Sequence, residues 1–208
     1  MINSKTISEI NTQFVQSTMI ESKSQPPLKQ EQSAEPSSEV LAADSFDKMN
    51  LHPDLLRGIF GYGFIAPSFI QQKAILPLIS GKDIIAQAQS GTGKTGAFSI
   101  SALQTVDPLS PNVQIIILSP TRELAKQTGI VIKALSEYLK LGVSIFSGGS
   151  SIVEDIKKLK EGGVQVVVGT PGRVADLLKK KFLRGEYLKV LVVDEADEML
   201  TRGFKDQF

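Results

Sequence analysis

The sequence has 208 residues, 41% of them hydrophobic, and its 23 Lys and Arg nearly balance its 22 Asp and Glu. This length corresponds to one domain with an additional segment, and the even charge argues against a surface that attracts nucleic acid everywhere. Cysteine is absent and His52 is the only histidine, which excludes disulfides and thiolate zinc sites. No apolar run reaches the roughly 18 residues of a membrane span, and the N-terminus lacks the pattern of a secretory signal. We therefore expect a protein of a reducing intracellular compartment without membrane contact.

Residues 1–44 differ in composition from the rest of the chain. They are rich in Ser, Gln, Glu, Asn and Thr, and Phe14 is their only aromatic residue. Such a segment cannot bury enough apolar surface to offset the entropy of ordering, so we predict a disordered tail over 1–44. The tail carries three Lys against six acidic residues, and the whole chain has a net charge of +1. Residues 45–208 therefore carry +4, and we expect any phosphate-binding face there.

Short apolar runs alternate with helical patterns from residue 46 onward. The runs are continuous and β-branched, which predicts strands buried on both faces, at 83–88, 113–118, 143–147, 164–169 and 189–194. Two stretches between these runs, 124–140 and 151–160, each place apolar residues along one face of a predicted helix. In the first stretch these residues are Leu124, Ile130, Ile132, Leu135 and Leu139, and in the second they are Ile152, Ile156 and Leu159. This alternation predicts an α/β domain with a mostly parallel sheet, whose ligands bind at the carboxyl ends of the strands.

The stretch AQSGTGKT at 88–95 follows the first of these strands and precedes a helical pattern. That context is typical of a loop that binds nucleotide phosphates. Glycines let backbone N–H groups turn toward anionic oxygens, and the start of a helix adds a favourable dipole. Lys94 would then reach the β- and γ-phosphates, and the Thr95 hydroxyl would bind Mg²⁺. Ala88 stands where such loops usually have glycine, and a glycine-rich turn without a ligand is the alternative interpretation.

The stretch VLVVDEAD at 190–197 places Asp194 and Glu195 at the carboxyl end of the last predicted strand. A carboxylate there can hold Mg²⁺, and its neighbour can orient an attacking water. Taken alone, an acidic pair after a strand also fits an ordinary helix start, where negative charge is favourable. The phosphate loop upstream favours the catalytic interpretation.

Six short motifs in this order resemble the first RecA-like domain of the DEAD-box RNA helicases. They are GFIAPSFIQ (63–71), AQSGTGKT (88–95), PTREL (120–124), the doublet Gly148–Gly149, TPGR (170–173) and DEAD (194–197). The resemblance covers about 46–208 and implies a RecA-like P-loop NTPase fold. Within that family, LLRGIFGYGF (55–64) and AQAQSGTGKTGAFSI (86–100) look most like the translation initiation factor 4A group, with its nuclear exon-junction paralogue as the alternative. Phe69 and Ser119 are small departures from the family pattern.

The resemblance also implies a role for each motif residue. Lys94, Asp194 and Glu195 would be catalytic, with Thr95 and Asp194 holding Mg²⁺, the latter through a water molecule. Asp197 would couple this domain to a later Ser-Ala-Thr motif. ATP would be bound by Phe46, which stacks on adenine, by Gln71, which hydrogen-bonds the adenine edge, and by Gln89, Ser90, Gly91, Thr92, Gly93, Lys94 and Thr95. RNA would be bound by Pro120, Thr121, Arg122, Gly148, Gly149, Thr170, Pro171, Gly172 and Arg173.

These RNA-binding residue types suit sugar and phosphate rather than base edges, so binding is expected to be independent of sequence and sensitive to salt. An ordinary helix-start charge is the alternative for Arg122 and Arg173. We expect a monomer whose protein partners include translation-initiation scaffolds, in the cytoplasm first and the nucleus second.

The Ser-Ala-Thr motif and the second RecA-like domain do not occur in these 208 residues. In the family, the strand bearing that motif lies between the phosphate-loop strand and the DEAD strand. Its absence would leave a gap of about 10 Å between 83–88 and 189–194. The domain 45–208 is therefore expected to be incomplete at its C-terminus, and this chain alone to be inactive as an enzyme. Two functions stay open: part of an ATP-dependent RNA helicase, or a non-catalytic fragment that binds RNA or a partner.

Overall fold

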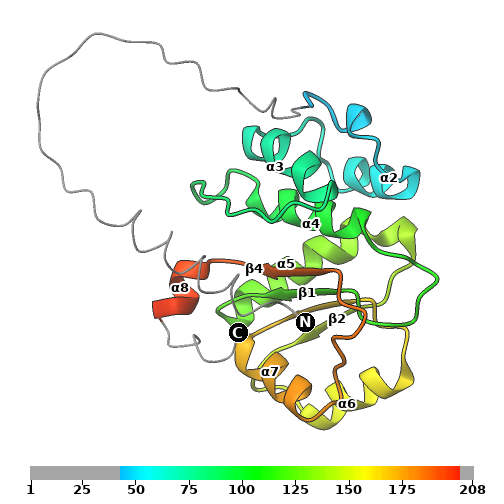
Figure 1. The fold of residues 1–208 in the computed structure, drawn as a ribbon, viewed down its shortest axis with the longest axis vertical. Coiled ribbons are helices and arrows are strands. Elements are labelled where there is room, and N and C mark those ends of the chain that lie inside the picture. Colours follow the sequence, from blue (N-terminus) through cyan, green and yellow to red (C-terminus); the bar gives the residue numbers. More distant parts are fainter. Residues whose placement is uncertain (1–42, 202–208) are drawn as a thin grey trace, which may run out of the picture. The chain divides into compact units, whose positions relative to one another are not determined.

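A parallel sheet of four strands forms the centre of the computed structural model, which describes residues 43–201 (Figure 1). The strands are β1 (Ile115–Leu118), β2 (Val143–Phe146), β3 (Val166–Gly169) and β4 (Val190–Val193), in the order β2-β3-β1-β4. All three pairings are parallel, with Ile115 opposite both Val166 and Val190. The four residues of β1 and of β3 are all buried, as their continuous β-branched sequences predict. An α/β fold with a parallel sheet is thus confirmed, and four of the five predicted strands are present.

Helices cover both faces of this sheet. The elements in chain order are η1 (Phe46–Met49), α2 (Pro53–Gly61), α3 (Phe69–Ile79), α4 (Lys94–Gln104), α5 (Arg122–Leu135), η2 (Glu137–Leu139), α6 (Ile152–Glu161), α7 (Pro171–Lys179) and α8 (Ala196–Thr201). One hydrophobic core joins α2 to α5 with alternate residues of β1 and β3, among them Ile115, Ile117 and Val168. The opposite core joins Ile116 and Val167 of the same strands to α6, α7 and α8. The period-2 alternation of side chains therefore distributes one apolar run between two cores.

The predicted strand at 83–88 is wrong. No residue from 82 to 89 belongs to a strand, and Ile85 is 66% exposed. In the described part of the chain, β4 forms one edge of the sheet and pairs only with β1. A β-branched run becomes a strand only when a neighbour bonds its N–H and C=O groups, and no strand of the described sheet pairs with 83–88.

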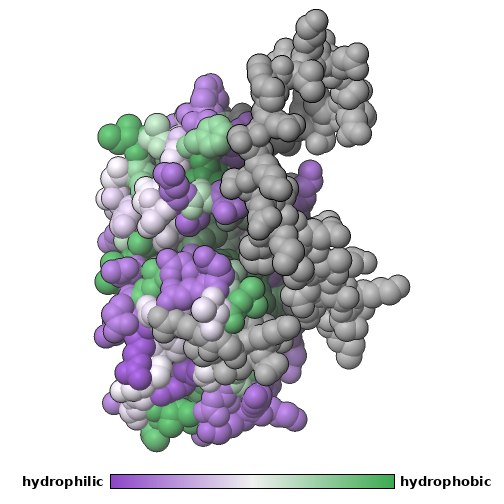
Figure 2. All heavy atoms as spheres, turned by 90° about the vertical axis from the view of Figure 1, so that its left-hand side faces the viewer, coloured by the Kyte–Doolittle hydropathy of each residue, from purple (hydrophilic) through white to green (hydrophobic). Residues whose placement is uncertain are grey.

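The free edge at β4 leaves apolar side chains exposed. Leu191 is 44% exposed and Val193 is 38% exposed, on the last strand of the described sheet. Figure 2 shows hydrophobic patches lying among hydrophilic residues on the face that it displays. The gap expected between 83–88 and 189–194 is consistent with this unpaired edge.

The predicted helices are present, but their bounds and some of their buried residues differ from the prediction. The pattern at 124–140 forms α5 and the short η2, and Ile130, predicted on the buried face, is 63% exposed. Thr128 and Gly129 are buried in its place. A Cβ at Gly129 would overlap the side chain of Ile145, so close packing against β2 requires glycine there. Among the described residues, no helix is long and apolar enough to cross a membrane.

Most of the predicted tail lies outside the described residues. Every described residue belongs to the compact unit Glu39–Phe208. Ala43 already packs in the first core at 7% exposure, and Asp44 forms a salt bridge of 2.8 Å with Lys48. His52 caps the start of α2, where its Nδ1 accepts a hydrogen bond from the Asp54 N–H at 3.2 Å.

Candidate functional site

The loop 89–93 connects the segment 82–88, which belongs to no strand, to α4, as predicted for a phosphate-binding loop. Gly91 and Gly93 have φ values of +80° and +100°, which favour glycine. Lys94 begins α4, and its Nζ donates to the carbonyl oxygen of Ala88 at the start of the loop. Thr95 is half-buried in the first turn of the helix. The loop therefore brings the ammonium group, the hydroxyl group and the free N–H groups of a helix start together.

Gln71 joins this loop to the start of α3. Its Oε1 accepts from the Ser68 N–H at 2.8 Å, and its Nε2 donates to the Gly93 carbonyl at 3.2 Å. A Cβ on Gly93 would lie 2.8 Å from Ser68 Oγ, so glycine is needed for this close approach. Gln71 is only 3% exposed. In this structure its amide supports the phosphate loop, and a contact with a nucleotide base stays a prediction.

Phe46, predicted to stack on a base, lies in the first core at 1% exposure. Its ring stacks on Phe64, with centroids 6.3 Å apart and planes at 25°, and meets the edge of Phe60. A base could reach this ring only after the aromatic pair opens. Its stacking role therefore stays a prediction.

Asp194 and Glu195 follow β4 directly, at the carboxyl end of the sheet. Asp194 is 8% exposed, and this burial raises the pKa of its carboxyl group, while a hydrogen bond from the Glu195 backbone and the charge of Lys94 partly oppose the shift. Glu195 has a φ of +50° and is exposed. A hydrogen bond with the Glu198 side chain, then burial and the charges of Asp194, Glu198 and Asp197, raise the pKa of Glu195. The phosphate-loop lysine and the acidic pair thus belong to one electrostatic site.

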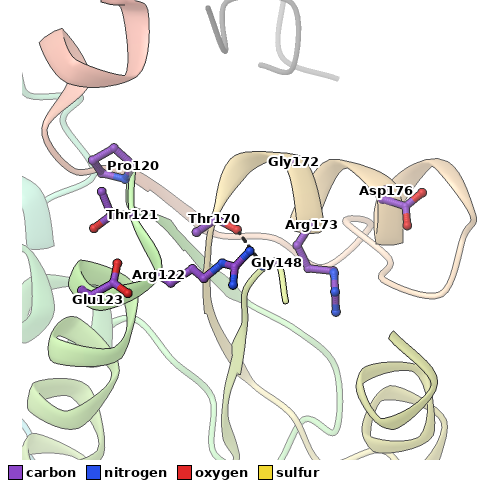
Figure 3. Close-up of a pocket in the computed structure, with 9 residues that line it drawn as sticks. All are labelled: Pro120, Thr121, Arg122, Glu123, Gly148, Thr170, Gly172, Arg173 and Asp176. Carbon is purple, nitrogen blue, oxygen red and sulfur yellow. Dashed lines mark hydrogen bonds between the residues drawn. The ribbon is translucent and has the colours of Figure 1, made fainter. Parts of the chain in front are cut away.

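Residues from three separate motifs line a pocket of about 870 Å³ at the carboxyl ends of β1, β2 and β3 (Figure 3). Thr121 caps α5 by accepting a hydrogen bond from the Leu124 N–H at 3.2 Å. Thr170 caps α7, and its Oγ1 accepts from the Gly148 N–H at 3.3 Å. Seven of the nine predicted RNA-binding residues line the pocket: Pro120, Thr121, Arg122, Gly148, Thr170, Gly172 and Arg173. The starts of two helices therefore face one open hollow that favours anions.

Gly149 shows why the doublet needs glycine. Its φ is +82°, and a Cβ added there would overlap Nη1 of Arg122. The guanidinium of Arg122 therefore lies directly against the loop 148–149, although the two motifs are 26 residues apart in sequence. Arg122 itself is exposed, and within residues 43–201 it makes no salt bridge.

Several residues of this region were not among the predicted site residues. Glu123 and Asp176 line the pocket, and Ser150 and Asp155 contact Arg173. Only Ser68 had a readable pattern, because Ser-x-x-Gln before an apolar run is typical of a capping box, and the Gln71 half of such a box is formed here, where Gln71 Oε1 accepts from the Ser68 N–H. Among the described residues, no cluster of three His, Cys, Asp or Glu side chains could hold a metal by itself.

The chain matches known proteins over most of this region. The DEAD/DEAH box helicase family model matches residues 68–208. The chain is 58% identical over 172 residues to eukaryotic initiation factor 4A-III homolog B of Oryza sativa, covering 83% of this chain and 42% of that protein. It is 57% identical over 164 residues to eukaryotic initiation factor 4A of Drosophila melanogaster, covering 79% and 40%. It thus spans about two fifths of the length of these curated relatives.

Solved structures with the same fold are also similar. A DEAD box protein from Methanococcus jannaschii aligns with a TM-score of 0.75 at 36% identity, over 80% of this chain and 45% of that one. The Dbp5 protein of S. cerevisiae bound to RNA and ADP BeF3 aligns with a TM-score of 0.70 at 41% identity, over 79% and 42%. The chain belongs to the DEAD/DEAH box helicase family.

Proposed function

We propose that this chain provides the first RecA-like domain of an ATP-dependent RNA helicase, binding ATP–Mg²⁺ and the RNA backbone. The observation that carries the proposal is the pocket at the carboxyl ends of β1, β2 and β3, where separate motifs meet. Family membership supports the same activity. The structure of S. cerevisiae Dbp5 with RNA and ADP BeF3, which shares the fold at 41% identity, supports both ligands.

The charged residues of the proposed nucleotide site, Lys94, Asp194 and Glu195, suit the binding of ATP and Mg²⁺. Lys94 leaves the Ala88 carbonyl and binds the β- and γ-phosphates when a nucleotide enters. The Thr95 hydroxyl and, through a water molecule, the Asp194 carboxylate would hold Mg²⁺, which would neutralise phosphate charge when bound. A divalent cation suits Asp194, because the residue is only 8% exposed and burial disfavours its uncompensated negative charge, which raises its pKa. Glu195, at the mouth of this site, orients the water that attacks the γ-phosphate.

The RNA site recognises sugar and phosphate. Arg122 offers a guanidinium without a salt-bridge partner among the described residues, and the starts of α5 and α7 offer backbone N–H groups. None of these donors reads a base edge, so the site binds single-stranded RNA of any sequence. Binding of the backbone in this pocket, next to the DEAD segment, links RNA to the nucleotide site.

Salt titration of RNA binding tests this proposal. The 208-residue chain should bind fluorescent oligouridylate and oligoadenylate with similar affinity, and the affinity should fall steeply as KCl rises from about 50 to 200 mM. Arg122→Gln should reduce the slope of log K against log salt by about 0.7, the value for one phosphate contact on a single strand. Equal binding of the wild type and this variant at every salt concentration would contradict the proposal.

A second candidate is a fragment that binds RNA or a partner without hydrolysing ATP. The unpaired segment 83–88 and the free edge of β4 favour it for the 208-residue chain, because the phosphate loop lacks the support of the sheet. RNA binding without ATP turnover is the outcome that supports this candidate.

Translation initiation is the cellular role that we propose first. Drosophila initiation factor 4A supports it at 57% identity, and the rice 4A-III homologue supports the nuclear exon-junction alternative at 58%. Initiation scaffold proteins and a cytoplasmic location belong to the first role, and we propose that the protein acts as a monomer. Cell fractionation followed by immunoblotting separates the two, since the first role requires the cytoplasmic fraction.

A further inference from the structure

The guanidinium of Arg173 is already occupied by contacts within the chain. Its Nη1 pairs with Asp155 Oδ2 and donates to Ser150 Oγ at 3.4 Å, and its Nη2 donates to the Ser150 carbonyl at 2.8 Å. In Figure 3 the Arg173 side chain extends away from α7, whereas the Arg122 guanidinium lies beside Thr170 and Gly148. The two arginines of the pocket therefore have different surroundings.

Asp155 is the buried partner in this arrangement. Its side chain is 4% exposed and that of Arg173 is 11% exposed, whereas the described pairs Lys157–Glu161 and Lys180–Asp176 are at least one-third exposed on both sides. A carboxylate this buried needs its cation, and breaking such a pair is strongly destabilising. Release of Arg173 to bind a phosphate would leave Asp155 buried and uncompensated.

The pair joins three segments that shape the pocket. Arg173 is in the first turn of α7, Asp155 is in the first turn of α6, and Ser150 directly follows the Gly148–Gly149 doublet. The doublet in turn lies against Arg122. The Asp155–Arg173 pair therefore fixes the loop on which the exposed arginine rests.

We infer that Asp155 and Arg173 are positioning residues of the RNA site, and that Arg122 supplies the cationic contact with phosphate. This inference rests on the proposed RNA binding and changes the role of Arg173 within it. Asp155, which no motif identifies, becomes a residue on which RNA affinity depends although it does not touch RNA.

The sign of one charge change tests the inference. Asp155→Asn and Glu161→Gln each remove one negative charge from α6, and Glu161 is exposed in a surface pair with Lys157. If charge alone mattered, both would leave RNA binding equal or tighter. Positioning predicts that Asp155→Asn weakens binding of oligouridylate roughly tenfold, the size of one lost charge-assisted contact. Glu161→Gln should leave it within about twofold. Tighter binding by Asp155→Asn with a steeper salt slope would show that freed Arg173 contacts phosphate, and would overturn the inference.

Coupling to Arg122 separates positioning from a general loss of structure. Asp155→Asn should release the loop 148–150, on which Arg122 rests, so the further loss of Arg122 should then reduce RNA affinity less. The double variant Asp155→Asn/Arg122→Gln should therefore bind RNA no more weakly than Arg122→Gln alone. Each variant is measured well below its own Tm. Additive losses in the double variant would overturn the inference.

Thermal unfolding provides a readout that does not depend on RNA. Asp155→Asn and Arg173→Gln should each lower Tm by on the order of 10 °C, and the double variant should be no less stable than the worse single variant. If the decrease in Tm of the double variant equalled the sum of the two single decreases, Asp155 and Arg173 would not stabilise each other. Absence of salt-dependent RNA binding by the wild type would sink the proposed function, while leaving this thermal test to judge the pair on its own.

Discussion

The two halves of the sheet's carboxyl edge are built differently. At β1, β2 and β3, paired strands deliver helix starts and loops to a pocket whose residues contact one another. At the other half, the phosphate loop follows an extended segment without a sheet partner, and β4 presents a free edge. The comparison teaches that a sequence can contain a phosphate-loop motif although the segment before the loop pairs with no strand of the sheet. We therefore expect RNA-backbone binding to be more complete than nucleotide chemistry in the 208-residue chain.

ATP turnover should show the largest effect. Phosphoryl transfer needs Lys94, Mg²⁺ and Glu195 placed together, and displacement by about 1 Å can cost on the order of 100-fold. The purified 208-residue chain should therefore release no more phosphate from ATP, with Mg²⁺ and single-stranded RNA, than its Lys94→Ala variant. Phosphate release well above that control would mean that the site is competent without a partner strand. In a form that does turn over ATP, Glu195→Gln should abolish hydrolysis and leave ATP binding largely intact.

A single added methyl group should disrupt the pocket at the carboxyl ends of β1, β2 and β3. Gly149→Ala should weaken RNA binding roughly tenfold or more, because the new Cβ overlaps Arg122 and moves its guanidinium. Gly162→Ala is the matched control, since Gly162 also has a positive φ, of +78°, but open space around its Cβ position. Fluorescence anisotropy with oligouridylate compares the two variants. Equal losses would assign the effect to backbone strain and not to Arg122.

The support of the phosphate loop can be weakened at Gln71. Gln71→Ala removes the bonds to Ser68 N and Gly93 O, and we expect weaker ATP binding by severalfold and a smaller preference for ATP over GTP. Gln72→Ala is the control, because the neighbouring amide bonds only the Pro67 carbonyl, at 3.0 Å. Competition between the two nucleotides for the site measures the preference. An unchanged ratio with unchanged affinity would remove both roles from Gln71.

Stability should respond to Asp194 by a small amount. Its pKa is raised on folding, so the folded state binds the proton more tightly and the free energy of unfolding decreases as pH rises above the ordinary carboxylate range. Asp194→Asn removes this cost and should raise Tm at neutral pH by roughly 2 to 4 °C, while it removes a ligand for Mg²⁺. Asp83→Asn, at an exposed carboxylate, should leave Tm nearly unchanged. A lower Tm for Asp194→Asn would contradict the assigned cost of burial.

Much of this arrangement could be predicted from the sequence, and the wrong predictions concern features that depend on contacts with residues distant in the chain. The runs in β1 and β3 were recognisable because burial on both faces leaves them continuously apolar. The segment 83–88 shares only the pair Ile84–Ile85 with such runs, contains Asp83 and Gln87, and pairs with no strand of the described sheet. Ile130 was misplaced because the buried face of α5 is set by close packing of Gly129 on Ile145, which hydropathy does not record. The loop, the acidic pair and seven of the nine residues that line the pocket were identified from motifs. Asp155 was not, because a carboxylate on an amphipathic helix is normally solvated and only its distant partner buries it.

Hydrogen–deuterium exchange of the 208-residue chain tests the contrast between the two halves most directly. Amides of 83–88 should exchange within the shortest times measured, because no strand among residues 43–201 pairs with them, while those of 115–118 and 166–169 should be the slowest in the chain. Slow exchange across 83–88, comparable with that of β1, would show that this segment is a paired strand and would contradict the account.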